Sequence, residues 1–165
     1  ERFAWGYVID RLKVAQRVSE ACGSHLPELN VCIQVNLSGE PTKSGAAARE
    51  VGALARSVSV LPRLKLRGLT TIPEPCNDVA RPRVRFAELR RLLETLNTEG
   101  LGLDTLSMGM SSDLEAAILE GATIVRVGTA IFGSRSAADR ASQCCLLYTS
   151  PSPRDRTRSR MPSSA

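Results

Sequence analysis

The sequence predicts an α/β fold in which parallel strands alternate with helices. Three observations support this: the strand segments are almost continuously apolar, helical patterns separate them, and the connecting loops are short. A parallel sheet is covered on both faces, so its strands lack the polar and apolar alternation of half-exposed strands. The pattern fits an open α/β sheet or part of a (β/α)8 barrel, and by itself it does not separate them.

Five segments have the composition of buried strands, being short, apolar and rich in β-branched residues. These segments are residues 3–9, 31–37, 64–72, 103–108 and 123–127. Four helices are expected between them, over residues 10–21, 46–61, 83–98 and 111–121. Asp10 is the predicted cap of the first helix, and Ser112 with Glu115 fits the S-x-x-E capping box of the fourth.

The charge distribution separates the chain into a domain and a tail. The chain has 165 residues and a net charge of +5, but residues 144–165 hold four arginines and one acid, which leaves residues 1–143 with only +2. We therefore expect a domain over residues 1–143 that does not bind nucleic acid, followed by a disordered tail over residues 144–165. This tail resembles a translated sequencing adapter, so we interpret it as an artefact and assign it no function.

The sequence also limits the chemistry and the location of the protein. No apolar run is long enough for a membrane span and no signal sequence opens the chain, so we expect a cytoplasmic protein without a membrane partner. The five cysteines show no CxxC spacing, which disfavours a metal site or a disulfide framework. The single histidine, His25, lies in a predicted loop, so histidine-based catalysis is not expected.

Two strand ends rich in small polar residues predict a phosphate site. Residues 106–118 contain Ser111 and Ser112 at a predicted helix start, and residues 125–133 contain Gly128 and Thr129. Free N–H groups, hydroxyls and a close backbone approach suit a phosphate dianion. Either motif alone is that of an ordinary strand end, but the loops after the last two strands are the usual phosphate site of (β/α)8 barrels.

Further polar residues lie near the predicted strand ends. Arg126 belongs to an otherwise apolar strand beside the phosphate motif, so we interpret it as a ligand contact. Gln34 and Asn36 share one strand face and either border a ligand or are satisfied interior amides. The base-rate expectation for Lys43 is a solvated loop lysine, and Met108 suits packing.

Five motifs together resemble the pyridoxal phosphate homeostasis proteins, which are single-domain relatives of the alanine racemase N-terminal barrel. These motifs are Ile33-Gln-Val-Asn36, Thr42-Lys-Ser-Gly45, Leu66-Arg-Gly-Leu-Thr-Thr-Ile-Pro73, residues 106–118 and residues 125–133. The resemblance covers residues 1–135 and implies a (β/α)8 TIM barrel of fold type III, with pyridoxal 5'-phosphate (PLP) at its carboxyl-terminal rim.

The resemblance also implies roles for individual residues. Ser111, Ser112, Gly128 and Thr129 would hold the phosphate, and Arg126 would face the pyridine nitrogen. The same resemblance makes Asn36 and Met108 cofactor contacts. A cation facing the nitrogen disfavours ring protonation and so weakens the electron sink, which suits a cofactor carrier better than a versatile catalyst.

The expected function is therefore PLP binding and homeostasis without catalytic turnover, with no catalytic residues. The expected partners are PLP and PLP-dependent apo-enzymes, and the complete protein is expected to be a monomer. The alternative is an amino-acid racemase of the same fold, which would need a tyrosine base such as Tyr7 or Tyr148. A sugar-phosphate barrel enzyme would instead need acid–base carboxylates, for which Asp10 and Asp104 are the nearest candidates.

One departure from the family pattern is expected to limit the site. The family holds PLP covalently on a lysine in a Val-Ser-Lys-like context, and no segment of this sequence matches that motif. Residues 1–7 resemble the middle of the barrel, so we expect the first three strands and this lysine to be missing. The chain would then form an incomplete barrel that supplies phosphate contacts without the covalent link.

Overall fold

The structure is a computed structural model of the chain, and it describes residues 4–23, 25–37, 44–72 and 80–133. The chain divides into two units, Glu1–Gly128 and Thr129–Ala165. The first unit holds the sheet and helices α1 to α4, and the second holds the short helix α5 (Thr129–Phe132). The predicted boundary at residue 143 and the predicted tail lie outside the described residues.

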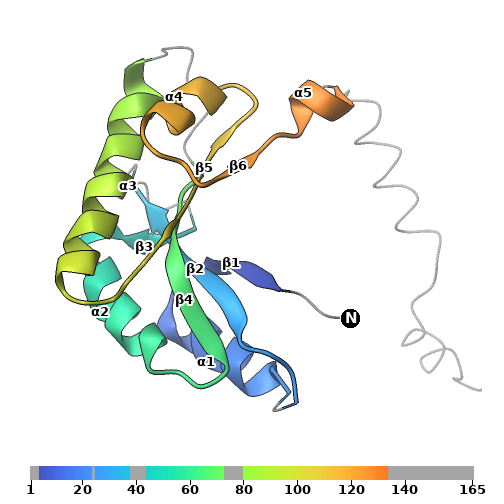
Figure 1. Cartoon of the computed structure of the whole chain (residues 1–165), viewed down its shortest axis with the longest axis vertical. Coiled ribbons are helices and arrows are strands. Elements are labelled where there is room, and N and C mark those ends of the chain that lie inside the picture. The colour runs from blue at the N-terminus through green and yellow to red at the C-terminus, as the bar shows by residue number, and fades with distance from the viewer. Residues whose placement is uncertain (1–3, 24, 38–43, 73–79, 134–165) are drawn as a thin grey trace, which may run out of the picture. The chain divides into compact units, whose positions relative to one another are not determined.

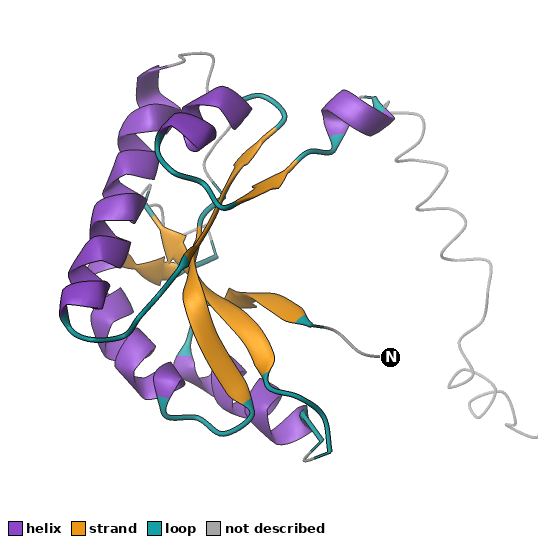
Figure 2. Cartoon of the chain, viewed as in Figure 1, coloured by secondary structure: helices purple, strands orange, loops and turns teal. Residues whose placement is uncertain are grey.

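The first unit is built on a parallel sheet, as predicted (Figure 2). Its main strands are β1 (Trp5–Ile9), β2 (Leu29–Asn36), β4 (Leu64–Thr70), β5 (Thr105–Met110) and β6 (Ile124–Arg126). They pair in the order β1-β2-β4-β5-β6, and every pairing in the described part of the chain is parallel. A two-residue strand that the sequence did not predict, β3 (Ala46–Ala47), pairs with the end of β2.

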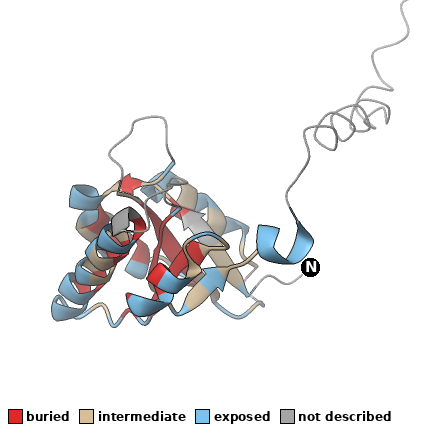
Figure 3. Ribbon diagram, turned by 90° about the horizontal axis from the view of Figure 1, so that it is seen from above, coloured by how far each residue is buried: buried red, intermediate tan, exposed pale blue. Residues whose placement is uncertain are grey.

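Four helices cover one face of this sheet (Figure 1). They are α1 (Leu12–Ala21), α2 (Ala48–Ser59), α3 (Ala80–Thr98) and α4 (Leu114–Leu119). Apolar residues recur at helical spacing on the faces turned to the sheet, such as Val51, Ala55 and Val58 on α2. They pack on strand residues that share one register row, Ile33, Leu69 and Leu106, so the buried residues gather between the helices and the sheet (Figure 3).

Two predicted helix caps are wrong. Arg11 is the N-cap of α1, while the carboxylate of Asp10 accepts hydrogen bonds from the guanidinium of Arg11, the shortest at 2.7 Å. The N-cap of α4 is Asp113, without a side-chain cap bond, so the capping box of Ser112 and Glu115 does not form. In both cases the helix begins later than the cap motif predicted. In the first helix the carboxylate of Asp10 is engaged by the neighbouring Arg11, and in the fourth the N-cap is Asp113.

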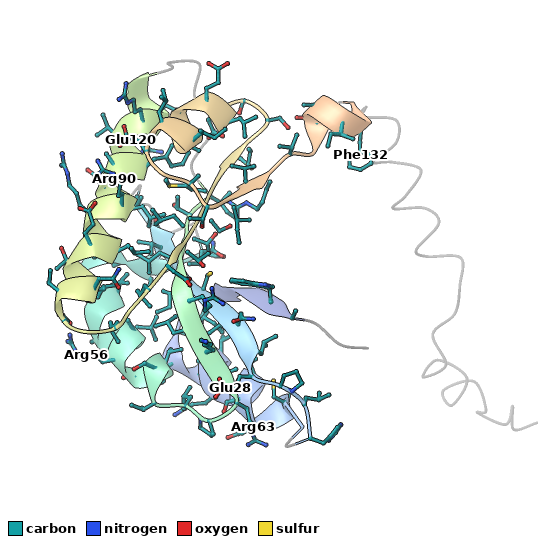
Figure 4. The ribbon with its side chains drawn as sticks, viewed as in Figure 1. Glu28, Arg56, Arg63, Arg90, Glu120 and Phe132 are labelled. Atoms are coloured by element: carbon teal, nitrogen blue, oxygen red, sulfur yellow. The ribbon has the colours of Figure 1, made fainter. Side chains whose placement is uncertain are left out.

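The carboxylate of Glu120 ties α4 to α3 (Figure 4). Its Oε1 lies 2.7 Å from Nε of Arg83, and its Oε2 lies 3.3 Å from an amino nitrogen of Arg90. The hydrogen bond from Arg83 holds the pKa of Glu120 below its usual value, and Arg90 adds to this effect. The pair therefore fixes the short helix that follows β5 to the long helix that precedes this strand.

The face of the sheet opposite the helices carries rows of polar and small residues. Cα partners on parallel strands point to the same side, so pairing places Cys32, Gly68 and Thr105 in one row. The next row toward the carboxyl ends is Gln34, Thr70 and Ser107, and all three side chains are buried. Residues from different strands thus meet in layers on this face.

One bulge distorts the register on this face. The pairing of β2 with β4 shifts between Val31 and Cys32, so that Arg67 is the extra residue opposite them. Gly68 follows this bulge, and a Cβ atom there would lie 1.8 Å from the carbonyl oxygen of Thr105. Glycine is required at this point because β4 and β5 approach each other too closely for a side chain.

Candidate phosphate-binding site

The structure brings the two predicted phosphate motifs together at the carboxyl ends of β5 and β6. Ser111 follows β5 directly, and Gly128 lies two residues after Arg126, the last residue of β6. The backbone N–H of Gly128 donates a hydrogen bond to Oγ of Ser111, with a nitrogen–oxygen distance of 3.2 Å. Residues 17 positions apart in the sequence thus present a hydroxyl and an amide at one point of the rim.

Gly128 has open space where a side chain would lie. A Cβ atom built on Gly128 would meet no heavy atom within 4 Å, and the residue is exposed. Ser112 is exposed as well, while Ser111 is half-buried. This rim therefore carries exposed hydroxyl and amide groups of the kind that bind phosphate, and the residues present fit such a group. In this structure the N–H of Gly128 donates to Ser111.

The turn between β5 and α4 differs from the prediction. Helix α4 begins at Leu114, so Ser111 and Ser112 belong to a turn that precedes the helix rather than to its first residues. The Oδ1 atom of Asp113 accepts the N–H of Met110 at 2.5 Å. This local contact ties the Asp113 carboxylate to the end of β5.

Arg126 reaches from β6 past β5 to the end of β4. One of its amino nitrogens lies 3.1 Å from Oγ1 of Thr70, and the other lies 2.6 Å from the carbonyl oxygen of Thr71. Arg126 is half-buried, and both threonines are almost fully buried. Neither threonine was predicted as a site residue. The sequence feature that could have indicated them is a pair of polar residues at the end of an otherwise apolar strand.

The remaining predicted site residues lie in different settings. Asn36 ends β2 and is half-buried, and Gly45 packs so closely on it that a Cβ on residue 45 would lie 2.9 Å from its backbone nitrogen. The amide nitrogen of Gln34 donates to the carbonyl oxygen of Ser44 at 2.9 Å, so it holds the chain that leads into β3. The predicted residue Lys43 lies outside the described residues.

Two more predicted contacts remain predictions. Met108 is fully buried on β5 and belongs to the apolar core. Thr129 is exposed and is the first residue of α5 in the second unit, where its carbonyl oxygen accepts the N–H of Gly133 at 3.0 Å.

The two candidate acid–base carboxylates are bound to arginines. Asp104 precedes β5, at the opposite end of the strand from Ser111, and accepts hydrogen bonds from Arg67. The partner arginine lowers the pKa of each carboxyl, Arg67 that of Asp104 and Arg11 that of Asp10. A general acid near neutral pH needs a raised pKa, so these residues do not support the sugar-phosphate enzyme.

The amino ends of the strands also carry a hollow. A cavity of about 490 Å³ is lined there by residues that include Lys65, Arg67, Gly102 and Asp104. It lies at the opposite end of the strands from Ser111 and Gly128, and two of its charged residues, Arg67 and Asp104, pair with each other. Within the described ranges, no cluster of metal-ligating residues occurs and no helix is long and apolar enough to cross a membrane.

Comparison with known proteins identifies relatives of this chain. Residues 4–136 match the family of alanine racemase N-terminal domains. The chain is 58% identical over 142 residues to the pyridoxal phosphate homeostasis protein of Pseudomonas aeruginosa, a match that covers 86% of this chain and 60% of the relative. It is 47% identical over 135 residues to the Escherichia coli protein of the same name, covering 82% of this chain and 58% of the relative.

A solved structure gives the same picture of the fold. The structure of PipY from Synechococcus elongatus with PLP bound matches with a TM-score of 0.72 and 34% identity, over 79% of this chain and 61% of that protein. The described strands thus form part of the α/β barrel that the sequence resemblance implied. The chain spans about three-fifths of the length of these relatives, and it belongs to the alanine racemase N-terminal domain family.

Proposed function

We propose that this chain binds pyridoxal 5'-phosphate at the carboxyl ends of β5 and β6, as part of a protein that maintains the PLP supply of the cell. The observation that carries the proposal is the meeting of Ser111 and Gly128, whose hydroxyl and amide lie 3.2 Å apart beside open space. The relatives named for PLP homeostasis and the PLP-bound PipY structure support the choice of ligand.

The residues at this rim suit the two ends of the cofactor. Ser111, Ser112 and Gly128 supply hydroxyl and backbone donors, which a phosphate dianion requires in number. Thr129 stays the fourth phosphate contact that the sequence predicts. Arg126, the last residue of β6, lies two residues before Gly128 and serves the ring, where its positive charge disfavours a protonated pyridine nitrogen.

Two more residues belong to the proposed site. Asn36 lies at the end of β2 on the face opposite the helices and would border the ring. Met108, buried beside the strand end, would support the cofactor by packing.

The proposed role is that of a carrier rather than a catalyst. Bound PLP supplies an aldehyde that reacts with amines and a ring that withdraws electrons from the adduct. Arg126 weakens that withdrawal, which suits a cofactor carrier better than a versatile catalyst. The proposed recipients of the cofactor are PLP-dependent apo-enzymes. A racemase would need a second base; of the two tyrosines, Tyr7 belongs to β1 and Tyr148 lies outside the described residues.

A binding titration tests the proposal. PLP fluorescence would be followed as the chain is added, with Ser111→Ala as the site variant and Ser59→Ala as the matched control. Ser59 lines the cavity at the amino ends, so its loss changes a serine far along the strands from the proposed site. We expect Ser111→Ala to weaken binding about tenfold or more, the value of one hydrogen bond to a charged group. Equal affinities for both variants would contradict the proposed site.

Two further measurements define the function. The PLP-loaded protein is expected not to racemise L-alanine, which circular dichroism of the substrate would detect; turnover would favour the racemase instead. Removal of residues 144–165 is expected to leave PLP affinity unchanged, since we assign that segment no part in binding. A loss of affinity on removal would contradict this assignment.

A further inference from the structure

We propose that Thr70 is a positioning residue that holds the guanidinium of Arg126 in the orientation it needs to face the cofactor ring. This inference rests on the proposed function, because it concerns the residue that meets the ring of PLP. Thr70 lies on β4, a strand that carries none of the proposed phosphate contacts.

The hydrogen-bond direction at Thr70 is fixed by its neighbours. A threonine hydroxyl has one proton and two lone pairs. The proton goes to the carbonyl oxygen of Ser107, 2.9 Å away on β5. The lone pairs are thereby left for a donor, and an amino nitrogen of Arg126 lies 3.1 Å away. Because Thr70 is only 1% exposed, water does not compete for this contact.

A second contact sets the plane of the guanidinium. The other amino nitrogen of Arg126 donates to the carbonyl oxygen of Thr71 at 2.6 Å. That carbonyl belongs to a residue held by the main chain, because the N–H of Thr71 donates to the carbonyl oxygen of Ser107, 3.2 Å away on β5. A planar guanidinium bound through two nitrogens keeps one orientation, whereas a single contact would let it rotate.

The position of Thr70 in the sheet explains why this residue can act across two strands. Thr70 pairs with Gln34 on one side and with Ser107 on the other, so all three side chains share the face opposite the helices. Arg126 reaches this row from β6, which is separated from β4 by the whole width of β5. A long, flexible side chain is thus ordered before the ligand arrives, which removes that ordering cost from binding.

The two threonines provide a matched pair of variants. Thr70→Val removes the hydroxyl that Arg126 contacts, whereas Thr71→Val removes an equally buried hydroxyl but leaves the carbonyl oxygen that Arg126 contacts. Both variants lose one buried bond to a main-chain oxygen, so general loosening of the sheet affects them alike. Thr70→Ser restores the hydroxyl and serves as the rescue.

The first readout does not depend on the cofactor. The ¹⁵N relaxation of the Arg126 Nε–Hε group, assigned with Arg126→Lys, measures the order of the guanidinium in the full chain. We expect an ordered group in the wild type, in Thr71→Val and in Thr70→Ser, and a mobile group in Thr70→Val alone. An ordered Arg126 in Thr70→Val, or equal mobility in both valine variants, would overturn the proposal.

The second readout is the PLP dissociation constant, measured by fluorescence. We expect Thr70→Val to raise it about five- to tenfold, with Thr71→Val within about twofold of wild type. If the wild type binds no PLP but Arg126 loosens in Thr70→Val alone, the proposed function fails while the hold of Thr70 on Arg126 stands. If PLP binds and the valine variants bind equally, the positioning role fails and the proposed function stands.

A third variant covers the case in which Thr70→Val does not fold. Arg126→Lys keeps the positive charge but cannot reach both oxygens with a planar fork. We expect it to weaken PLP binding by an amount similar to Thr70→Val. Wild-type affinity in Arg126→Lys would overturn the need for a fixed orientation.

Discussion

An arginine lies toward each end of the parallel strands, and the two are held in opposite ways. Toward the amino ends, Arg67 meets the carboxylate of Asp104, the amide oxygen of Asn30 and the ring of Trp5, whose centroid lies 5.3 Å from its guanidinium carbon. At the carboxyl ends, Arg126 binds the neutral oxygens of Thr70 and Thr71. We name these four residues, Trp5, Asn30, Arg67 and Asp104, the amino-end cluster.

The difference shows how an arginine can either stabilise the fold or bind a ligand, depending on its partners. In the amino-end cluster a carboxylate balances the arginine, so the field that the pair presents to an anion is weak. At the carboxyl ends the contacts with Thr70 and Thr71 orient the guanidinium through neutral oxygens. We expect an anionic ligand at the carboxyl ends, where Ser111 and Gly128 meet, although the described cavity lies at the amino ends.

The largest expected effect is a difference in the free energy of unfolding between alanine variants of two glycines. Gly68→Ala would place a Cβ 1.8 Å from the carbonyl oxygen of Thr105, so we expect it to lower the free energy of unfolding by about 3 kcal/mol or more. Gly128→Ala meets no atom within 4 Å and should leave that free energy nearly unchanged while weakening PLP binding. Urea unfolding and PLP titration of both variants check this. Similar losses of stability in the two variants would contradict the view that Gly68 is required by the fold and Gly128 by the ligand.

The next prediction compares the loss of each of the two arginines. Arg126→Ala should weaken PLP binding about tenfold or more, because a hydrogen-bonding charged group facing the ligand is lost. Arg67→Ala should leave PLP affinity unchanged and lower stability by at most about 1 kcal/mol, since its pair with Asp104 is largely solvent-exposed. Fluorescence titration and urea unfolding measure the two effects. A larger loss of affinity in Arg67→Ala would reverse the assignment of the two ends.

The smallest effect is a pH dependence of the helix that follows β5. The pKa of Glu120 lies below its ordinary value of 4.5, mainly because Arg83 donates to it. A depressed carboxyl pKa contributes stability that is fully present above pH 4.5 and is lost as the pH falls through the folded-state value. We therefore expect Glu120→Gln to flatten the decline of the urea midpoint below pH 4.5, with Glu94→Gln as an exposed control that changes it little. An unchanged acid limb in Glu120→Gln would contradict this.

Much of the fold could be predicted from local pattern. Near-continuous apolar runs located all five main strands, because both faces of a parallel strand are covered. The pairing of Ser111 with Gly128 was also predictable, since carboxyl ends of consecutive parallel strands meet at one rim. The cap motif at Asp10 failed because the neighbouring guanidinium of Arg11 competed with capping. The motif at Ser112 lies one residue before the observed N-cap, Asp113.

Contacts that depend on strand order escaped the sequence analysis. Thr70 and Arg126 are 56 positions apart and meet only because β4, β5 and β6 lie side by side. The two-residue β3 is too short to leave a pattern, and its residues were assigned to the following helix. A glycine after a charged residue inside an apolar strand was the available signal for the bulge at Arg67 and Gly68.

The most direct test of the ligand site is a map of backbone amide shifts in ¹H–¹⁵N spectra as PLP is added to the chain. We predict the largest shifts at Ser111 and Gly128, with little change at Gly102 and Asp104 beside the amino-end cavity. Shifts concentrated at Gly102 and Asp104, with Ser111 and Gly128 unmoved, would contradict it and place the ligand at the other end of the strands.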